Sequence, residues 1–232
     1  MFFIGPPFGN YVDLKNIVAI KGSFTLEPRT GLLRQILKTL RYNFTYRDWV
    51  NKIGLRNKGI DYAIENYKKG TIVSIAVLNE NEIPKLVEKV PKNMDIELNV
   101  SCPNAEKNMV STGLSAFLND ERQWCIIKLS PMCSHSLIDE YYTQGFRQFH
   151  CSNTIPVPEG GLSGSAIIPF NEKNIRYIKS KYTDVQVIGG GGIKTWDNVE
   201  QYQKMGADHF AFSSVTFCPY LFGKLYWNII NN

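Results

Sequence analysis

Residues 95–104 read Asp-Ile-Glu-Leu-Asn-Val-Ser-Cys-Pro-Asn. The stretch begins with the alternating pattern of a short strand, and Pro103 ends it because proline fixes φ and has no N–H to donate. Asn99, Cys102 and Asn104 are therefore expected at or just past the carboxyl end of a strand, where barrels and open α/β sheets bind ligands. Asparagine suits a planar amide or imide partner, and a cysteine beside it can be a nucleophile, a base or a ligand. Taken alone, the motif fits an ordinary turn with a packed cysteine equally well.

The size and composition of the chain predict one soluble globular domain over residues 1–232, with a sizeable core. The formal net charge of +5 is spread along the chain, so it permits an anionic ligand but does not predict a nucleic-acid partner. The 5 cysteines form no Cys-x-x-Cys pair, so we expect neither a zinc site nor a disulfide framework.

The sequence also bears on location and metals. The first ten residues lack a basic segment followed by an apolar core, so we expect no signal peptide, and no apolar run is long enough for a membrane span. Scattered cysteines fit a reducing, cytoplasmic compartment. His135, His150 and His209 show no metal-ligand spacing and are interpreted as surface or core residues.

Short apolar segments alternate along the chain with amphipathic ones. The predicted strands cover residues 2–4, 17–20, 72–76, 96–99, 125–129, 149–151, 185–188 and 209–212. The predicted helices cover residues 60–69, 81–90, 134–144, 171–181 and 195–205. Alternating strands and helices predict parallel strands with right-handed crossovers, and eight such strands predict a compact (β/α)₈ TIM barrel.

Two connections depart from this pattern. Only residues 5–16 separate the first two strands, and Pro6 and Pro7 lie early among them, so we expect the first crossover helix to be missing. The second is the segment of residues 21–59, which is long and irregular, as loops that shape an active-site face often are. Within them, residues 32–49 are basic and aromatic, which favours a solvated lid or hairpin over a segment on a membrane surface.

Glycine runs follow two of the late strands. Residues 189–192 are four glycines that end the seventh strand, and residues 160–164 read Gly-Gly-Leu-Ser-Gly after the sixth. Ser213 and Ser214 end the eighth strand. Glycines let backbone N–H groups approach an anion, and barrels commonly bind phosphate with the loops after strands seven and eight. Each run alone fits a simple turn, but together they favour a phosphate site.

Polar residues lie at the ends of other predicted strands. Lys128 is within the fifth strand, where it is expected to point inward toward a negatively charged ligand; the alternative is an exposed lysine at the strand end. Asn153 and Thr154 follow the sixth strand, and Asn51 opens a further polar loop.

Together these residues carry a resemblance to a known family. The catalytic-loop motif of the dihydroorotate dehydrogenases resembles residues 99–104, and further family motifs match in order and spacing. These matches cover residues 25–29, 51–59, 127–129, 152–154, 160–164 and 190–193. The resemblance implies an FMN-containing (β/α)₈ barrel that oxidises dihydroorotate to orotate in pyrimidine biosynthesis.

The resemblance also implies roles for residues. Cys102 would be the catalytic base, and Lys128 would stabilise reduced, anionic flavin. The substrate-binding residues would be Asn51, Ile53, Gly54, Leu55, Asn99, Asn104, Asn153 and Thr154. The cofactor-binding residues would be Lys21, Lys128, Gly164, Gly191, Gly192, Ser213 and Ser214.

A cysteine base is typical of the soluble members of the family, whereas the membrane-bound members use serine. The resemblance thus implies a soluble, cytoplasmic oxidoreductase with a pyrimidine substrate, and a homodimer is its expected assembly. The electron acceptor stays open between fumarate, NAD and another oxidant. An NAD route would need a separate iron–sulfur subunit, because no cysteine cluster in this chain suits such a centre.

Two other interpretations stay open. The chain fits a non-catalytic barrel that binds flavin or a pyrimidine as a binding module, and the shortened first unit motivates this alternative. A flavin-dependent tRNA dihydrouridine reductase is another FMN barrel, but it requires an RNA-binding extension and a stronger basic face.

Overall fold

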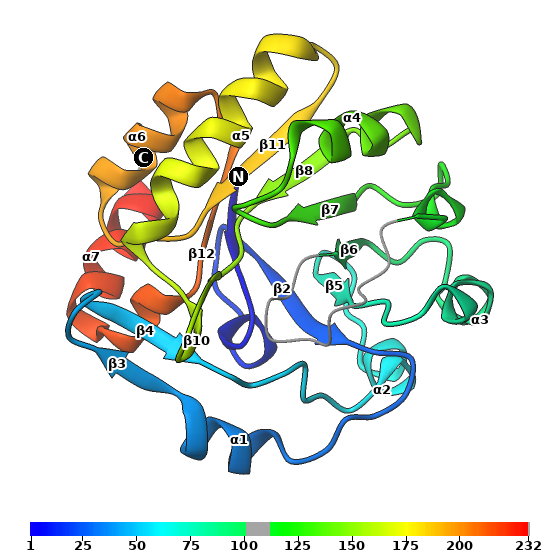
Figure 1. Cartoon of the computed structure of the whole chain (residues 1–232), viewed down its shortest axis with the longest axis horizontal. Coiled ribbons are helices and arrows are strands. Elements are labelled where there is room, and N and C mark those ends of the chain that lie inside the picture. Colours follow the sequence, from blue (N-terminus) through cyan, green and yellow to red (C-terminus); the bar gives the residue numbers. More distant parts are fainter. Residues whose placement is uncertain (101–111, 232) are drawn as a thin grey trace.

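The computed structural model describes residues 1–100 and 112–231. Eight parallel strands close a barrel in the order β1-β12-β11-β8-β7-β6-β5-β2 (Figure 1). These strands are β1 (Phe2–Ile4), β2 (Ile17–Phe24), β5 (Ile72–Ile75), β6 (Ile96–Asn99), β7 (Cys125–Leu129), β8 (Gln148–Cys151), β11 (Gln186–Gly190) and β12 (His209–Phe212). The predicted TIM barrel is confirmed, and every predicted strand lies in it.

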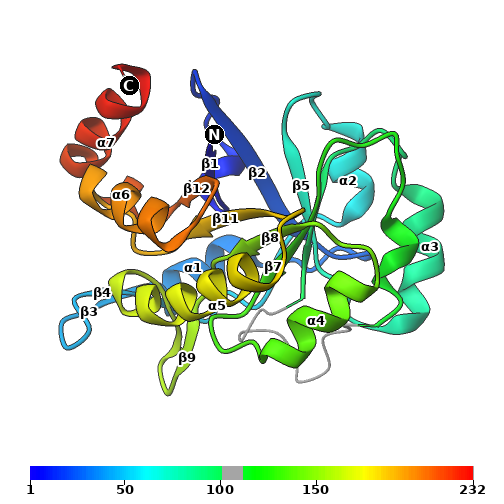
Figure 2. The same ribbon diagram turned by 90° about the horizontal axis from the view of Figure 1, so that it is seen from above.

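Helices surround the strands on the outside (Figure 2). They are α2 (Ile60–Glu65), α3 (Ile83–Lys89), α4 (His135–Thr143), α5 (Ile168–Lys181), α6 (Trp196–Met205) and α7 (Pro219–Asn231). Thr195 and Asn198 form a capping box that starts α6, as the residue types favour. Helix α5 begins three residues before the predicted start because Pro169 fits its first turn. The terminal helix α7 was not predicted.

The missing first crossover helix is confirmed. Between β1 and β2 the chain forms only a 3₁₀ turn, η1 (Phe8–Asn10), which packs on the carboxyl end of the barrel. A Cβ at Gly9 would lie 2.1 Å from the carbonyl oxygen of Ile20 and 2.6 Å from that of Ile4, so only glycine fits there. The Asn10 side chain accepts a hydrogen bond from the Gly22 backbone N–H at 2.9 Å, which holds the turn against β2.

The irregular segment after β2 forms helix α1 (Leu32–Thr39) and a hairpin of β3 (Arg41–Asn43) and β4 (Asp48–Asn51). The hairpin joins β10 (Gly160–Leu162) and β9 (Ile155–Val157) in an antiparallel sheet of order β3-β4-β10-β9. Figure 1 shows this small sheet and α1 on one side of the barrel. The predicted hairpin is confirmed, and it packs against the loop after β8 that carries a glycine run.

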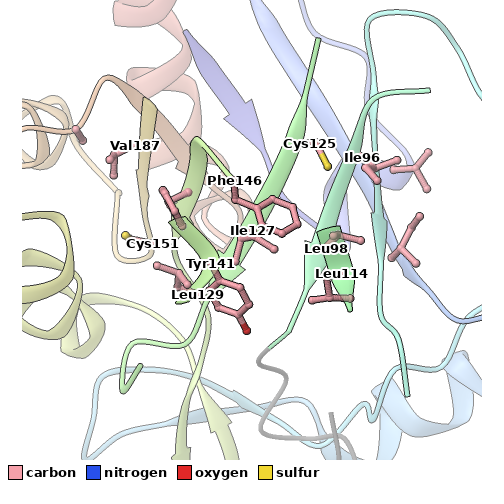
Figure 3. Close-up of a cluster of buried hydrophobic side chains, with 14 of the residues drawn as sticks. Ile96, Leu98, Leu114, Cys125, Ile127, Leu129, Tyr141, Phe146, Cys151 and Val187 are labelled. Carbon is pink, nitrogen blue, oxygen red and sulfur yellow. The ribbon is translucent and has the colours of Figure 1, made fainter. Parts of the chain in front are cut away.

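The barrel has two apolar cores. Between strands and helices lies the larger one, part of which Figure 3 shows around Ile127, Tyr141 and Phe146. Inside the barrel a smaller cluster fills one end. Its members are Phe3, Ile20, Ile72, Trp124, Ile126, Ile188 and Ala211. Polar side chains lie at both ends of the strands. Gln148, Gln186 and His209 begin their strands, and Asn99 and Lys128 lie at or near the carboxyl ends.

Candidate active site

Two adjoining cavities open at the carboxyl ends of the barrel strands, each of about 350 Å³. Both cavities are bordered by residues of the first connection, of the end of β4 and the loop after it, of β7 and of the loop after β8. The shared lining residues are Pro6, Pro7, Tyr11, Asn51, Ile53, Lys128, Asn153 and Thr154. The two cavities are therefore halves of one cleft, as a site for two ligands in contact requires.

The first cavity collects the residues predicted to bind substrate, together with Lys21. They are Asn51, Ile53, Gly54, Leu55, Asn99, Asn153 and Thr154. Asn99 is buried at the end of β6, where its amide donates to the Ser23 hydroxyl at 2.8 Å and its carbonyl accepts from the Asn153 amide at 3.2 Å. These hydrogen bonds orient both amides. Cys102 and Asn104 lie outside the described residues.

The second cavity collects the predicted cofactor residues except Lys21, which lines only the first cavity. Gly164, Gly191, Gly192, Ser213 and Ser214 all line it, with Lys128 at the border to the first cavity. Gly192 has a φ of +76°, and a Cβ there would lie 2.9 Å from the Ser165 Cα. The close approach of these two loops therefore depends on glycine at this position.

A buried carboxylate supports the polar end of the barrel. Glu97 on β6 is fully buried and accepts a hydrogen bond from the Ser74 hydroxyl at 2.8 Å. Its other oxygen lies 2.6 Å from His150 Nδ1, and the Lys128 ammonium lies 3.5 Å from Oε1. Burial by itself raises the pKa of the Glu97 carboxyl, but Lys128 and His150 outweigh it and lower that pKa to about 2.

The position of Lys128 follows from this carboxylate. A lysine within a central strand is costly to bury without a counter-charge, and Glu97 supplies one from the neighbouring strand. The Lys128 side chain is only 12% exposed and lines both cavities. The prediction that Lys128 points inward is confirmed.

The sequence analysis did not predict that the side chains of Glu97 and His150 lie in the barrel interior beside this site. His150 was interpreted as a surface or core residue, and it is buried at the floor of the second cavity. One available signal was the alternation in β8, where Phe149 and Cys151 face the outer core and leave His150 facing the barrel interior. Glu97 had the same signal in β6, where Ile96 and Leu98 face outward.

A second buried carboxylate ties the hairpin to two loops that line the second cavity. Asp48 on β4 accepts hydrogen bonds from Lys194 Nζ at 2.7 Å and from the Ser165 backbone N–H at 3.1 Å. A Cβ at Gly164 would lie 1.8 Å from this carboxylate, so glycine is required beside it. Asp48 therefore holds together three segments that border the second cavity.

Replacing Asp48 by alanine is expected to lower the free energy of unfolding by about 1.5 to 3 kcal/mol, because two hydrogen bonds to a buried charge are lost. Urea unfolding monitored by circular dichroism measures this change. A matched control is Asp61→Ala, which removes an exposed carboxylate that lies 2.6 Å from Lys89 and should cost about 0 to 1 kcal/mol. Equal effects of the two variants would contradict the structural role of Asp48.

Comparison with known proteins identifies relatives over almost the whole chain, although no family model matches it. The catalytic subunit of dihydroorotate dehydrogenase B (NAD(+)) from Halalkalibacterium halodurans is 28% identical over 266 residues, which covers 97% of this chain and 85% of the relative. The same subunit from Bacteroides thetaiotaomicron is 25% identical over 253 residues, covering 93% and 81%. The chain is a divergent relative of the dihydroorotate dehydrogenases.

Solved structures agree on the fold. A DHODH from Eimeria tenella, in complex with ferulenol, superposes with a TM-score of 0.73 at 17% identity and covers 93% of this chain and 74% of its own. The ligand-free form from the same organism gives a TM-score of 0.67 at 16% identity. This likeness shows the fold alone, a TIM barrel, in which the first crossover of this chain is a 3₁₀ turn.

The described residues, 1–100 and 112–231, hold neither a metal-binding cluster nor a helix that could span a membrane. They contain no cluster of three His, Cys, Asp or Glu side chains arranged to hold a metal ion. In the same part of the chain, every helix is too short or too polar to cross a bilayer.

Proposed function

We propose that this protein is an FMN-dependent oxidoreductase that oxidises dihydroorotate to orotate in pyrimidine biosynthesis. One observation carries the proposal: the two halves of the cleft have different residues of their own, and Lys128 lies with Asn51 and Asn153 where the halves meet. Gly54, Leu55 and Asn99 border only the first half, and the second half alone is bordered by Gly164, Gly191, Gly192, Ser213 and Ser214. We further propose that the enzyme works in the cytoplasm as a homodimer, as its resemblance to the soluble dehydrogenases implies.

The second half of the cleft fits FMN. Backbone at Gly191 and Gly192 has positive φ, and Gly192 approaches Ser165 so closely that a side chain would fill the gap. Ser213 and Ser214 line the same wall. Such a cradle suits the phosphate, while Lys128 at the inner border suits the electron-rich edge of the ring. When bound, FMN would supply the acceptor for the hydride from C6 of the substrate.

The first half of the cleft would hold the pyrimidine. Asn51, Asn99 and Asn153 offer amide donors and acceptors to the ring and its carboxylate, and Thr154 adds a hydroxyl. Cys102 would remove the C5 proton, so that the electron pair of the C5–H bond forms the C5=C6 double bond as the C6 hydride leaves. Cys102 and Asn104 come to this proposal from their place in the family motif alone.

The visible absorption spectrum of the purified protein tests the proposal. We expect a flavin band that bleaches when dihydroorotate is added without oxygen, because substrate oxidation reduces the cofactor. A flavin band that stays unchanged would refute the substrate. A colourless protein that takes up no added FMN would refute the cofactor and favour the alternative of a non-catalytic binding module.

A further inference from the structure

His150 presents an unsatisfied polar atom at the cofactor half of the cleft. The residue is 1% exposed and lines the second cavity but not the first. Its Nδ1 faces Glu97, which lines neither cavity. Its Nε2 is buried, and no group among the described residues hydrogen-bonds to it.

The hydrogen bond to Glu97 fixes the proton of the imidazole. Glu97 is ionised, and at 2.6 Å its carboxylate accepts the proton on Nδ1. Burial lowers the pKa of His150 and outweighs Glu97, which raises it. The lowered pKa favours the neutral ring. A neutral imidazole with its proton on Nδ1 has a lone pair on Nε2, so Nε2 is a hydrogen-bond acceptor.

Leaving a buried acceptor unpaired is unfavourable, so Nε2 calls for a ligand group that donates a hydrogen bond to it. Lys128 is the register neighbour of His150 on the adjacent strand and lines the same cavity. A donor beside an acceptor matches a carbonyl next to an N–H, which is the pattern of an imide. Flavin and pyrimidine both contain an imide, but His150 borders only the half of the cleft that fits the flavin.

We propose that His150 is a cofactor-binding residue whose Nε2 accepts a hydrogen bond from the imide N–H of the flavin ring. The proposal rests on FMN being the cofactor, as proposed above. Oxidised flavin has one ring N–H, at N3, so the proposed hydrogen bond joins flavin N3 to His150 Nε2. Glu97 then acts as a positioning residue that keeps the Nδ1 proton in place.

Two variants separate the cavity contact from the contact to Glu97. In His150→Asn the amide nitrogen can replace Nδ1 and keep the bond to Glu97, but nothing replaces Nε2. In His150→Gln the longer side chain can place its carbonyl oxygen near the position of Nε2. The dissociation constant of FMN, measured by the quenching of flavin fluorescence on binding to the apoprotein, should rise about tenfold in His150→Asn and recover in His150→Gln.

An FMN analogue methylated at N3 tests the contact from the side of the ligand. It lacks the N–H, so wild-type protein should bind it about tenfold more weakly than FMN, while His150→Asn should bind both alike. The ¹⁵N chemical shift of His150 Nε2 should also move when FMN binds to the wild-type protein. Affinity for orotate, measured separately, should not change in His150→Asn.

The outcomes distinguish this proposal from the proposed function. Wild-type protein that binds no FMN would overturn both. Wild-type protein that binds FMN, with an unchanged affinity in His150→Asn and an unmoved Nε2 signal, would overturn the contact alone. A weakened affinity for orotate but not for FMN would assign His150 to the pyrimidine and overturn the proposal in that way.

Discussion

Replacing Glu97 by alanine is expected to lower the free energy of unfolding by about 3 to 5 kcal/mol. The substitution leaves the Lys128 ammonium without the carboxylate 3.5 Å away, in a side chain that is only 12% exposed. It also removes the acceptor for the Ser74 hydroxyl and for His150 Nδ1, both buried. Urea unfolding of the purified protein, followed by circular dichroism, measures the difference.

Two further variants are needed to interpret the effect of Glu97→Ala on stability. Glu97→Gln keeps an acceptor oxygen while it removes the charge, so it should destabilise less than alanine if lost hydrogen bonds contribute. Glu172→Ala is the surface control, because Glu172 pairs with Arg176 at 2.8 Å in a half-exposed position and should cost about 0 to 1 kcal/mol. A loss below 1 kcal/mol in Glu97→Ala would show that the buried cluster does not stabilise the barrel.

The same carboxylate makes stability depend on pH. Its pKa falls from 4.5 to about 2 on folding, so the unfolded chain binds the proton more tightly than the folded one. The contribution of roughly 3 kcal/mol is fully present above about pH 4.5 and is lost as the pH falls toward 2. In Glu97→Ala this part of the acid sensitivity should be missing from the unfolding curves.

Replacing Cys102 by alanine is expected to lower the turnover of dihydroorotate by about 10²- to 10⁴-fold, the range that removal of a general base produces. Binding of FMN should not change, because the predicted cofactor residues lie in other loops. The measurement is the anaerobic rate at which dihydroorotate bleaches the flavin, under single-turnover conditions at several pH values.

Graded substitutions test the base itself. Cys102→Ser keeps an ionisable group of much higher pKa, so its rate should be low at neutral pH and rise with pH, whereas Cys102→Ala should stay slow throughout. Cys218→Ala removes an exposed thiol and should leave the rate unchanged. Full turnover in Cys102→Ala at neutral pH would refute the role of Cys102 as base.

Much of the site was predictable because strand ends in a parallel barrel meet at one edge. Each of three site residues was predictable from its position relative to an apolar strand: Asn99 ends one, Lys128 interrupts one and Asn153 follows one. Once these strands are parallel and closed, their carboxyl ends converge, and the three residues line one cleft. The roles of Cys102 and Asn104 stay predictions, since both lie outside the described residues.

Other features could not be predicted, because they depend on which strands become neighbours. Nothing near Asp48 in the sequence indicates Lys194, 146 positions away, yet the two side chains lie 2.7 Å apart. The C-terminal helix α7 was missed as well.

The sequence by itself determined the barrel, the absence of its first crossover helix and the edge at which ligands would bind, because periodicity, proline and glycine act locally. Only the tertiary structure decided the electrostatics of that edge. Glu97 and His150 lie on non-adjacent strands, and closure of the barrel brings them to 2.6 Å and shields them from water. Because the two groups are buried and this close, the Glu97 carboxylate controls where the His150 ring carries its proton. No local sequence pattern encodes such an effect.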